Sequence, residues 1–486
     1  MRSRNTAILA LALTLGCAPR LAPVAAPRIS PELVASRLAE VDRLASRGCY
    51  LCLKEAAAAY AALLAETDDQ AVATKALENN LMLTLREVEL RIPDSGAYEA
   101  AHQLQDHVGS NYLPYFTALE KLRPAQQPIV VRGEPFLIKQ EFAERLALVK
   151  ELEKYTTVSA MRAHFYLALV LQTLQFRDIK AQVDAVVAAH PQDLSLQYRL
   201  LAFQPTYSEG RARELIGQET GFGEVHLLMG QRASLNGNLA GAYRELNRAR
   251  ELLPDSVSIA LSLANVTFSY ARYADALALY DRILASPAAA GFERQVELGR
   301  AKSLSYLKRH SEAIAMLDEL LLKDAGNTPG EKYYWRAWNR LQLGQAQLAY
   351  DDATTGLNAM RNDAIYRLAG MASFSLNRLA ESRTFFEEAL KMNKADCDSV
   401  RYLGLLDSAE GSWKPASGRF SIAASCYEAV ILRLQTELAD YEKDITGLSN
   451  GLITAKRAEI KEADALRVQS IDNAAAASKN ATAGMK

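Results

Sequence analysis

The sequence is poor in the residues that interrupt helices. It contains 25 Gly and 15 Pro among 486 residues, about 8% in total where average proteins have about 12%. Hydrophobic residues make up 49% of the chain and aromatic residues only 8%, which is enough apolar material for a large core and too much for general disorder. A chain short of turn residues and rich in Ala and Leu is predicted to form helices joined by brief loops.

The chain also lacks an excess of charge of either sign. Its 56 Lys and Arg residues face 57 Asp and Glu residues, so the formal net charge is −1. Binding along a nucleic acid needs a surplus of cations that neutralise phosphates. We therefore expect no nucleic-acid partner.

Familiar catalytic and cofactor motifs are missing as well. The sequence has no G-x-S-x-G, no P-loop and no G-x-G-x-x-G, and its six His residues form no HExxH. The nearest cluster, His102, Asp106 and His107, lacks a further ligand, so we expect structural or solvated roles. Carboxylates are too scattered to single out a catalytic pair. We predict no metal site, no cofactor and no enzymatic activity.

The N-terminus reads as a secretory signal. Arg2 and Arg4 precede the apolar run 7–16, which is too short to cross a bilayer as an ordinary helix. The segment 13–17, Leu-Thr-Leu-Gly-Cys, resembles the end of a bacterial lipoprotein signal, although Thr14 stands where that family prefers Leu. The resemblance implies a signal peptide over 1–17 and lipidation of Cys17.

Lipidation at Cys17 implies a chain that is exported and attached to a bacterial membrane only through its lipid, on the periplasmic side. Residues 18–30, with three Pro residues, are then a stiff tether. Ordinary secretion with cleavage after Ala26 is one alternative, which would leave Pro27 just after the cut. An uncleaved N-terminus is the other.

Four further cysteines remain: Cys49, Cys52, Cys397 and Cys426. We expect them to be buried or unpaired thiols. One or two envelope disulfides are an alternative, and redox or metal chemistry is another. The C-x-x-C at 49–52 lacks the βαβ context of a redox motif, and the other two cysteines lie 29 residues apart.

A helix-turn-helix pattern recurs from about residue 223. It carries two columns of small residues, twelve positions apart, that repeat at spacings of 34, 37, 36, 33 and 34 residues. A generic amphipathic helix would not produce them, whereas two antiparallel helices that cross closely require small side chains. The first column is Gly230, Ala264, Ala301, Ala337, Gly370 and Gly404, and the second is Ala242, Ala276, Ala313, Ala349, Ser382 and Ala416.

This pattern resembles the tetratricopeptide repeat (TPR), a 34-residue unit with Gly or Ala early in its first helix and Ala at the start of its second. The best copy runs from Leu235 through Ala249 to Pro254. About six units cover 223–424. The resemblance implies an all-α fold, a right-handed α-solenoid of antiparallel helix pairs that bury their apolar faces by stacking.

Weaker copies precede this array within a helical N-terminal region, 31–222. Residues 160–191 read as a divergent unit, 194–217 as a shortened one, and 33–64 as one more. Residues 68–150 do not fit the period. Their prolines predict several helices and a loop around 129–131, which is either a short strand or the place of an inserted function.

Two long helical stretches, rich in Glu, Lys, Ala and Leu, follow the array over 425–473. They are predicted to form a lid helix or an antiparallel hairpin that caps the last repeat. A partner-binding coiled coil is the alternative. Residues 474–486 are small and polar and are predicted to be disordered.

In the TPR family the first helix of each unit lines a concave groove, and the matching positions can be read from this sequence. The basic and Asn clamp of chaperone-binding members is not reproduced, because the column through Leu227, Leu261 and Leu298 is apolar. We expect Tyr334 and Trp338 to face the groove and Trp335 to lie in the core. The candidate groove residues are Gln231, Asn265, Lys302, Tyr334, Trp338, Arg367 and Met371.

Together these features predict a non-catalytic TPR scaffold or assembly lipoprotein of the bacterial cell envelope, whose partners are other envelope proteins or peptides. TPR lipoproteins of this kind assist pilus or outer-membrane protein assembly. Two alternatives are kept. One is a lipoprotein that binds a solute, such as a glycan, on a TPR framework. The other is an enzyme with its site in residues 68–150.

Overall fold

The computed structural model describes residues 29–483 apart from short internal gaps. Cys17 and most of the predicted tether therefore lie outside the described residues, and so do 484–486. The gaps are 109–111, 123–128, 132–133, 137–138, 174–175, 204–207, 290, 324–329 and 445.

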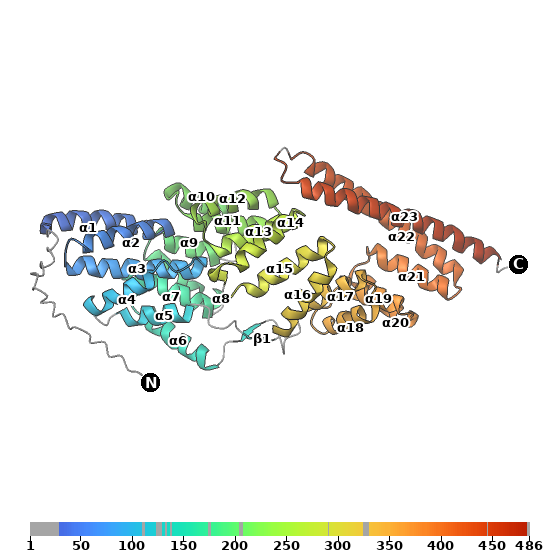
Figure 1. Ribbon diagram of the computed structural model, residues 1–486, viewed down its shortest axis with the longest axis horizontal. Helices are drawn as coiled ribbons and strands as arrows, with labels where there is room; N and C mark the ends of the chain where they lie inside the picture. Colours follow the sequence, from blue (N-terminus) through green and yellow to red (C-terminus); the bar gives the residue numbers. More distant parts are fainter. Residues whose placement is uncertain are drawn as a thin grey trace, which may run out of the picture.

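The described chain is all-α apart from one small hairpin (Figure 1). Strands β1 (Ile129–Val131) and β2 (Glu134–Phe136) pair antiparallel, with Ile129 opposite Phe136. The short strand suggested for 129–131 is thus confirmed. The helices of the N-terminal region are α1 (Pro31–Ala45), α2 (Tyr50–Leu64), α3 (Gln70–Leu90), α4 (Ala97–Val108), α5 (Leu113–Leu122), α6 (Lys139–Glu153), α7 (Ala160–Thr173), α8 (Phe176–Ala188), α9 (Leu194–Phe203) and α10 (Glu209–Gln218).

Six helix pairs form the array, as the small-residue columns predict. The pairs are α11 (Gly223–Leu235) with α12 (Leu239–Leu252), α13 (Val257–Ser269) with α14 (Tyr273–Leu284), α15 (Glu293–Tyr306) with α16 (His310–Lys323), α17 (Gly330–Gln342) with α18 (Ala346–Gly356), α19 (Asp363–Ser375) with α20 (Leu379–Met392), and α21 (Cys397–Ala409) with α22 (Trp413–Tyr441).

All twelve residues of the two small columns are buried. A Cβ on Gly230 would lie 2.6 Å from Leu246 Cγ, and one on Gly370 would lie 2.8 Å from the Phe386 ring. The one hydroxyl in the columns is also satisfied, because Ser382 Oγ donates to the Gly370 carbonyl oxygen at 2.9 Å across its helix pair. The columns therefore mark where paired helices cross, and the TPR-type solenoid is confirmed.

The turns within the pairs repeat a second feature. Each contains one residue with a positive φ, a conformation that favours Gly or Asn. Successive positions are separated by 34, 37, 36, 33 and 34 residues, the same series as the small columns. They are Gly237, Ala271, Lys308, Gly344, Asn377 and Gly411.

The N-terminal region and the array share one core. Leu53 of α2 and Leu83 of α3 are buried with Leu227 and Leu246 of the first repeat. The Ser256 hydroxyl donates to the Leu90 carbonyl oxygen at 2.7 Å, which fixes the end of α3 on the second repeat. Helix α3 thus joins the two regions into one body.

The C-terminal segment is an antiparallel hairpin of α22 and α23 (Asn450–Ala483), which lie side by side in Figure 1. Ala463 and Ala477 of α23 pack against α22, so α23 covers the last repeat as the capping prediction requires. The predicted disordered tail is wrong for the residues up to Ala483. Ala474 accepts a hydrogen bond from Ser417 Oγ at 3.0 Å, and packing on α22 continues the helix there.

The four cysteines after Cys17 are paired, so the prediction of buried or unpaired thiols is wrong and the disulfide alternative is the one found. Cys397 is bonded to Cys426, and Cys49 to Cys52. The antiparallel turn between α21 and α22 brings the first pair together although 29 residues separate them. Sequence spacing does not show this, because the distance depends on how two helices pack.

Candidate functional site

A continuous series of aromatic rings runs across the second, third and fourth repeats. We call it the aromatic strip. Tyr306 stacks on Tyr273 with centroids 4.5 Å apart and also contacts Trp335 at 5.7 Å. Trp335 and Trp338 meet edge to face at 5.9 Å. The strip consists of Phe268, Tyr273, Tyr306, His310, Tyr334, Trp335 and Trp338.

The strip is both anchored and accessible. The Tyr306 residue is 45% exposed, whereas Trp335 and Trp338 are half-buried. Trp335 packs on the buried cluster of Ala301, Leu317 and Leu320, so it borders the core without being enclosed in it. The prediction that Trp335 lies in the core is therefore only partly right.

A buried polar network fixes the ring of His310 beside Trp338. His310 Nδ1 lies 2.8 Å from Asn339 Oδ1, and Asn339 Nδ2 donates to Ser305 Oγ at 2.7 Å. Because the Asn339 amide nitrogen is already donating, its oxygen accepts from the imidazole. The His310 ring then meets Trp338 edge to face at 5.4 Å. These buried hydrogen bonds position the rings at the centre of the strip.

The predicted groove residues make contacts to neighbouring helices, some within one repeat and some between repeats. Gln231 donates to Ser262 Oγ at 3.2 Å, and Asn265 Oδ1 accepts from the Tyr280 hydroxyl at 2.7 Å. Lys302 pairs with Glu331. Arg367 pairs with the buried Asp396 at 3.0 Å, and Met371 packs beside the Phe386 cluster. These side chains join first helices to the elements beside them.

The apolar column expected in the groove is buried at its N-terminal end. Leu227 and Leu261 are 6% and 7% exposed. Leu227 lies in the core that α2 and α3 share with the first repeats, and Leu261 packs within its own helix pair. From Leu298 onward this column offers half-buried side chains, namely Leu298, Tyr334 and Arg367.

The tip of the α22–α23 hairpin reaches back to the second repeat. Leu452 is buried in the same cluster as Tyr270, beside Tyr441 and Leu448. Farther along α23, the carboxylate of Glu459 lies near enough to Tyr273 and Tyr306 to help raise the pKa of both hydroxyls. Burial raises the pKa of Tyr273 to about 12, with smaller contributions from Tyr306 and Glu459. The hairpin therefore passes beside the aromatic strip, which nothing in the repeat pattern predicted.

A Gly451→Val substitution is expected to release this tip. A Cβ at Gly451 would lie 2.4 Å from the Tyr270 carbonyl oxygen, a backbone atom that cannot move cheaply. We expect faster amide hydrogen exchange over 446–455 with an unchanged α22–α23 pairing. Gly418→Val is the matched control, because a Cβ there meets nothing within 4 Å. Equal exchange in both variants would contradict the docking of the tip.

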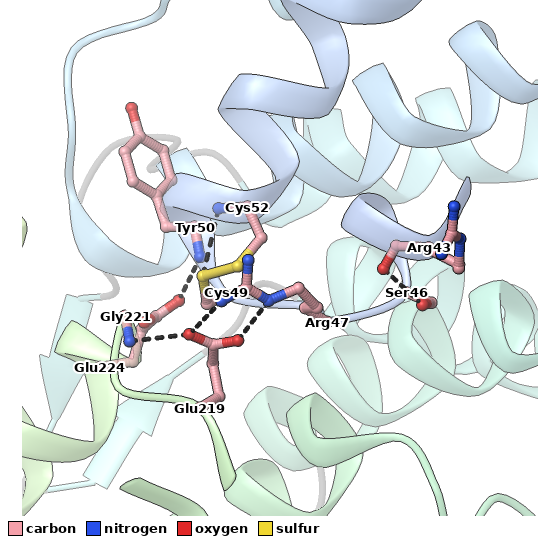
Figure 2. The surroundings of a disulfide bond; sticks show 9 residues. All are labelled: Arg43, Ser46, Arg47, Cys49, Tyr50, Cys52, Glu219, Gly221 and Glu224. Atoms are coloured by element: carbon pink, nitrogen blue, oxygen red, sulfur yellow. Dashed lines mark hydrogen bonds and ion pairs between the residues drawn. A yellow bond between two sulfur atoms is a disulfide. The ribbon is translucent and has the colours of Figure 1, made fainter. Parts of the chain in front are cut away.

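Figure 2 shows the surroundings of the Cys49–Cys52 disulfide at the start of α2. Arg47 Nη2 donates to Glu219 at 2.8 Å, and Glu219 also accepts from the Gly221 amide. Among the described residues, Cys49, Cys52 and Glu219 are the one group whose ligand atoms lie close enough for a metal. Their sulfurs are bonded to each other and Glu219 is paired with Arg47, so this arrangement ties α2 to the loop after α10.

A cavity of about 360 Å³ lies in the N-terminal region, partly lined by residues of the 68–150 segment. Its walls include His164 and Asp193. His164 Nε2 is 2.9 Å from Asp193 Oδ2, and its Nδ1 accepts from Arg199 Nε at 3.2 Å. Burial lowers the pKa of His164. With both ring nitrogens occupied, His164 has no free nitrogen for proton transfer, so the cavity shows no general base there.

Comparisons with known proteins give weak structural similarities. No protein-family model matches the chain, and no curated protein does. The match to the crystal structure of the APC/C hetero-tetramer Cut9-Hcn1 covers 85% of this chain and 73% of the matched chain, at 11% sequence identity and a TM-score of 0.47. The match to PilF of Pseudomonas aeruginosa covers 44% of this chain and 94% of the PilF chain, at 17% sequence identity and a TM-score of 0.38. The match to the TPR protein TTC0263 of Thermus thermophilus covers 36% of this chain and 94% of the TTC0263 chain, at 16% sequence identity and a TM-score of 0.31. The fold assignment rests on the repeat geometry of the chain itself.

Proposed function

We propose that this protein is a non-catalytic scaffold of the bacterial cell envelope that binds a segment of another protein along the aromatic strip. The observation that carries the proposal is the strip itself: large rings held by the core and by the His310 and Asn339 network, with Tyr306 left 45% exposed. Aromatic residues anchored in this way are typical centres of protein interfaces.

The position of the hairpin supports the same proposal. The α22–α23 hairpin passes beside the strip and rests on the second repeat, so a segment bound along the strip would also lie near α23. Such a segment would present apolar or aromatic side chains to the strip. Stacked helical repeats commonly offer extended surfaces of this type to protein partners.

Partner capture tests the scaffold role. The tagged chain is crosslinked in membranes of a bacterial host, purified and analysed for bound proteins. We expect one or a few envelope proteins in amounts comparable to the chain. Recovery of no protein, with a soluble sugar bound instead, would favour the solute-binding alternative.

Attachment through Cys17 is a separate part of the proposal, carried by the N-terminal sequence. None of the described helices has the length and hydropathy needed to cross a bilayer. Cells fed a clickable fatty acid are expected to label the wild-type chain in the membrane fraction, and a Cys17→Ala variant is expected to remain unlabelled. Labelling of both chains, or of neither, would count against lipidation at Cys17.

A further inference from the structure

The aromatic strip carries hydrogen-bond donors that the protein itself does not use. Among the described residues, no group accepts from the hydroxyls of Tyr273, Tyr306 or Tyr334, and none accepts from the indole N–H of Trp335 or Trp338. The polar atoms of the half-buried rings are not among the side-chain atoms that are buried without a partner, and Tyr306 is 45% exposed. These groups are therefore open to solvent and available to a ligand.

The free groups act as donors at neutral pH. Burial raises the pKa of Tyr273 to about 12 and also raises those of Tyr306 and Tyr334. Each hydroxyl therefore keeps its proton and can donate, and an indole N–H can do nothing else. His310 Nε2 is an acceptor, because Nδ1 of the same ring donates to Asn339. A matching ligand must therefore be rich in free acceptors.

The charged groups beside the strip are already paired. The Lys302 ammonium lies 6.0 Å from the ring centroid of Trp335 and pairs with Glu331. On α23, Glu459 pairs with Lys456 at 3.1 Å. Neither sign of charge is left without a partner at these places. The strip therefore favours an apolar, uncharged ligand over a charged one.

The backbone forms that a bound protein segment can take differ in what they offer to these donors. In a helix the carbonyl oxygens accept within the segment itself. A β-strand presents an N–H for every carbonyl oxygen, and an indole cannot accept from it. A polyproline II helix has no internal hydrogen bonds, and its proline residues lack an N–H. Such a segment presents free carbonyl oxygens together with apolar rings.

The rings of the strip also suit proline in shape. Tyr306, Trp335 and Trp338 have centroids 5.7, 5.9 and 6.4 Å apart, and their planes are inclined by 60°, 74° and 37°. They present faces and edges in different directions rather than one flat platform. Proline rings are compact and their φ is already fixed, so they can pack against inclined rings with little loss of conformational entropy.

We propose that the segment bound along the aromatic strip is proline-rich and takes the polyproline II form, a proposal that rests on the scaffold function above. The phenol and indole groups donate to carbonyl oxygens of the segment, and its proline rings pack on the aromatic rings. Aromatic-lined surfaces commonly receive segments of this form. An oligosaccharide could also stack on such rings, but it brings a donor with every hydroxyl oxygen.

Calorimetry with the purified chain tests the proposal, using a blocked peptide of nine L-proline residues as the probe. Its mirror image, nine D-proline residues, has the same rings and carbonyl oxygens but the opposite helix hand. We expect one site for the L-peptide, with the D-peptide and cellohexaose each at least tenfold weaker. Equal affinity for the two peptides would overturn the proposal, because apolar contact alone would then explain the binding.

A Tyr306→Phe substitution keeps the ring and removes one donor. We expect it to weaken binding of the L-peptide about three- to tenfold, the effect of one hydrogen bond. Tyr350→Phe is the matched control, because Tyr350 is a half-buried tyrosine of α18 that lies under Arg378 and outside the strip. It should bind within twofold of wild type. Equal affinities of the two variants would overturn the assignment of the donors.

A second measurement needs no loss of function. The chain has three Trp residues, so its labelled indole N–H groups give three NMR resonances. We expect the L-peptide to shift those of Trp335 and Trp338 and to leave that of Trp413 unchanged, because Trp413 lies at the last repeat. A shift of Trp413 alone, or no shift at saturating peptide, would overturn the proposal.

Polyproline binding and the scaffold function can fail separately. A captured protein partner that loses affinity in Trp338→Ala, in a chain that binds the L- and D-peptides equally, would overturn the polyproline form and keep the scaffold function. Binding of cellohexaose with no binding of any peptide or protein would overturn both.

Discussion

Replacing Glu89 by Gln is expected to lower the free energy of unfolding by about 3–5 kcal/mol. Glu89 is the carboxylate that holds two buried guanidinium groups, those of Arg86 and Arg199, which are 1% and 2% exposed. Arg86 Nη1 lies 3.0 Å from Glu89, and Arg199 Nη2 lies 2.9 Å from it. The amide would leave both cations in the core without their charge partner. Chemical denaturation followed by circular dichroism measures the loss.

The interaction of Glu89 with Arg86 and Arg199 also predicts that the stability of the fold depends on pH. Burial alone would raise the pKa of Glu89, but Arg199 and Arg86 outweigh it, so the pKa lies below its usual value. A carboxyl group with a lowered pKa stabilises the fold above the unfolded pKa of about 4.3, and that stability is lost as pH falls through the folded value. We expect the free energy of unfolding of the wild type to decrease as the pH is lowered below about 4.3. The Glu89→Gln variant is expected to lose less of its free energy of unfolding over the same pH range.

Glu209→Gln is the matched control for this substitution. Glu209 pairs with Arg213 at 2.6 Å, but both side chains are more than half exposed. Exposed ion pairs contribute about 0–1 kcal/mol. A Glu89→Gln variant no less stable than the Glu209→Gln variant would show that the buried pair does not hold the N-terminal region together.

A Trp338→Ala substitution is expected to weaken binding of the captured partner by about 30-fold or more, the cost of removing an interface anchor worth about 2 kcal/mol. Trp338 lies at the centre of the aromatic strip, against Tyr306, Trp335 and His310. Its removal takes away a contact surface and the ring that orders its neighbours. Titration of the purified partner by surface plasmon resonance gives the ratio.

Trp413→Ala provides the comparison, because Trp413 is also half-buried but packs beside Phe420 and Ala477 at the last repeat. We expect it to lower stability by an amount similar to Trp338→Ala while leaving partner affinity within threefold of wild type. Equal loss of affinity in both variants would move the interface away from the strip.

The repeat array could be predicted from the sequence because its physical cause is local. Two helices joined by a tight turn cross at a fixed offset, so positions such as Ala264 and Ala276 must be small in every copy, and both are fully buried. The turn residues obey the same period, as Gly237 and Gly411 show. A pattern imposed unit by unit is visible without any knowledge of distant contacts.

The candidate site could be predicted only in part. The aromatic residues of α17 were visible as a cluster, but Tyr306 and Tyr273 come from other repeats, and their 4.5 Å stacking depends on how the repeats are stacked. Arg367 looked like a groove residue because its position on the first helix is right. Its guanidinium also pairs with the carboxylate of Asp396, the residue that caps the first helix of the next repeat, at 3.0 Å, and this pairing depends on how the repeats stack.

The cavity could not have been found from the sequence at all. Asp42, Asn79 and His164 come from α1, α3 and α7, which are far apart in the sequence, and no motif connects them. The disulfide between Cys397 and Cys426 is hidden for the same reason, because two helices must first pack antiparallel.

The sequence by itself therefore determined the all-α class, the six helix pairs and the presence of two long helices after them, because each follows from local periodicity and helix propensity. Only the tertiary structure decided which cysteines pair, that the hairpin tip at Leu452 rests on the second repeat, and which helices enclose the cavity of the N-terminal region. These features join residues far apart in the chain. Their separation in space is set by the packing of whole helices, which sequence spacing does not encode.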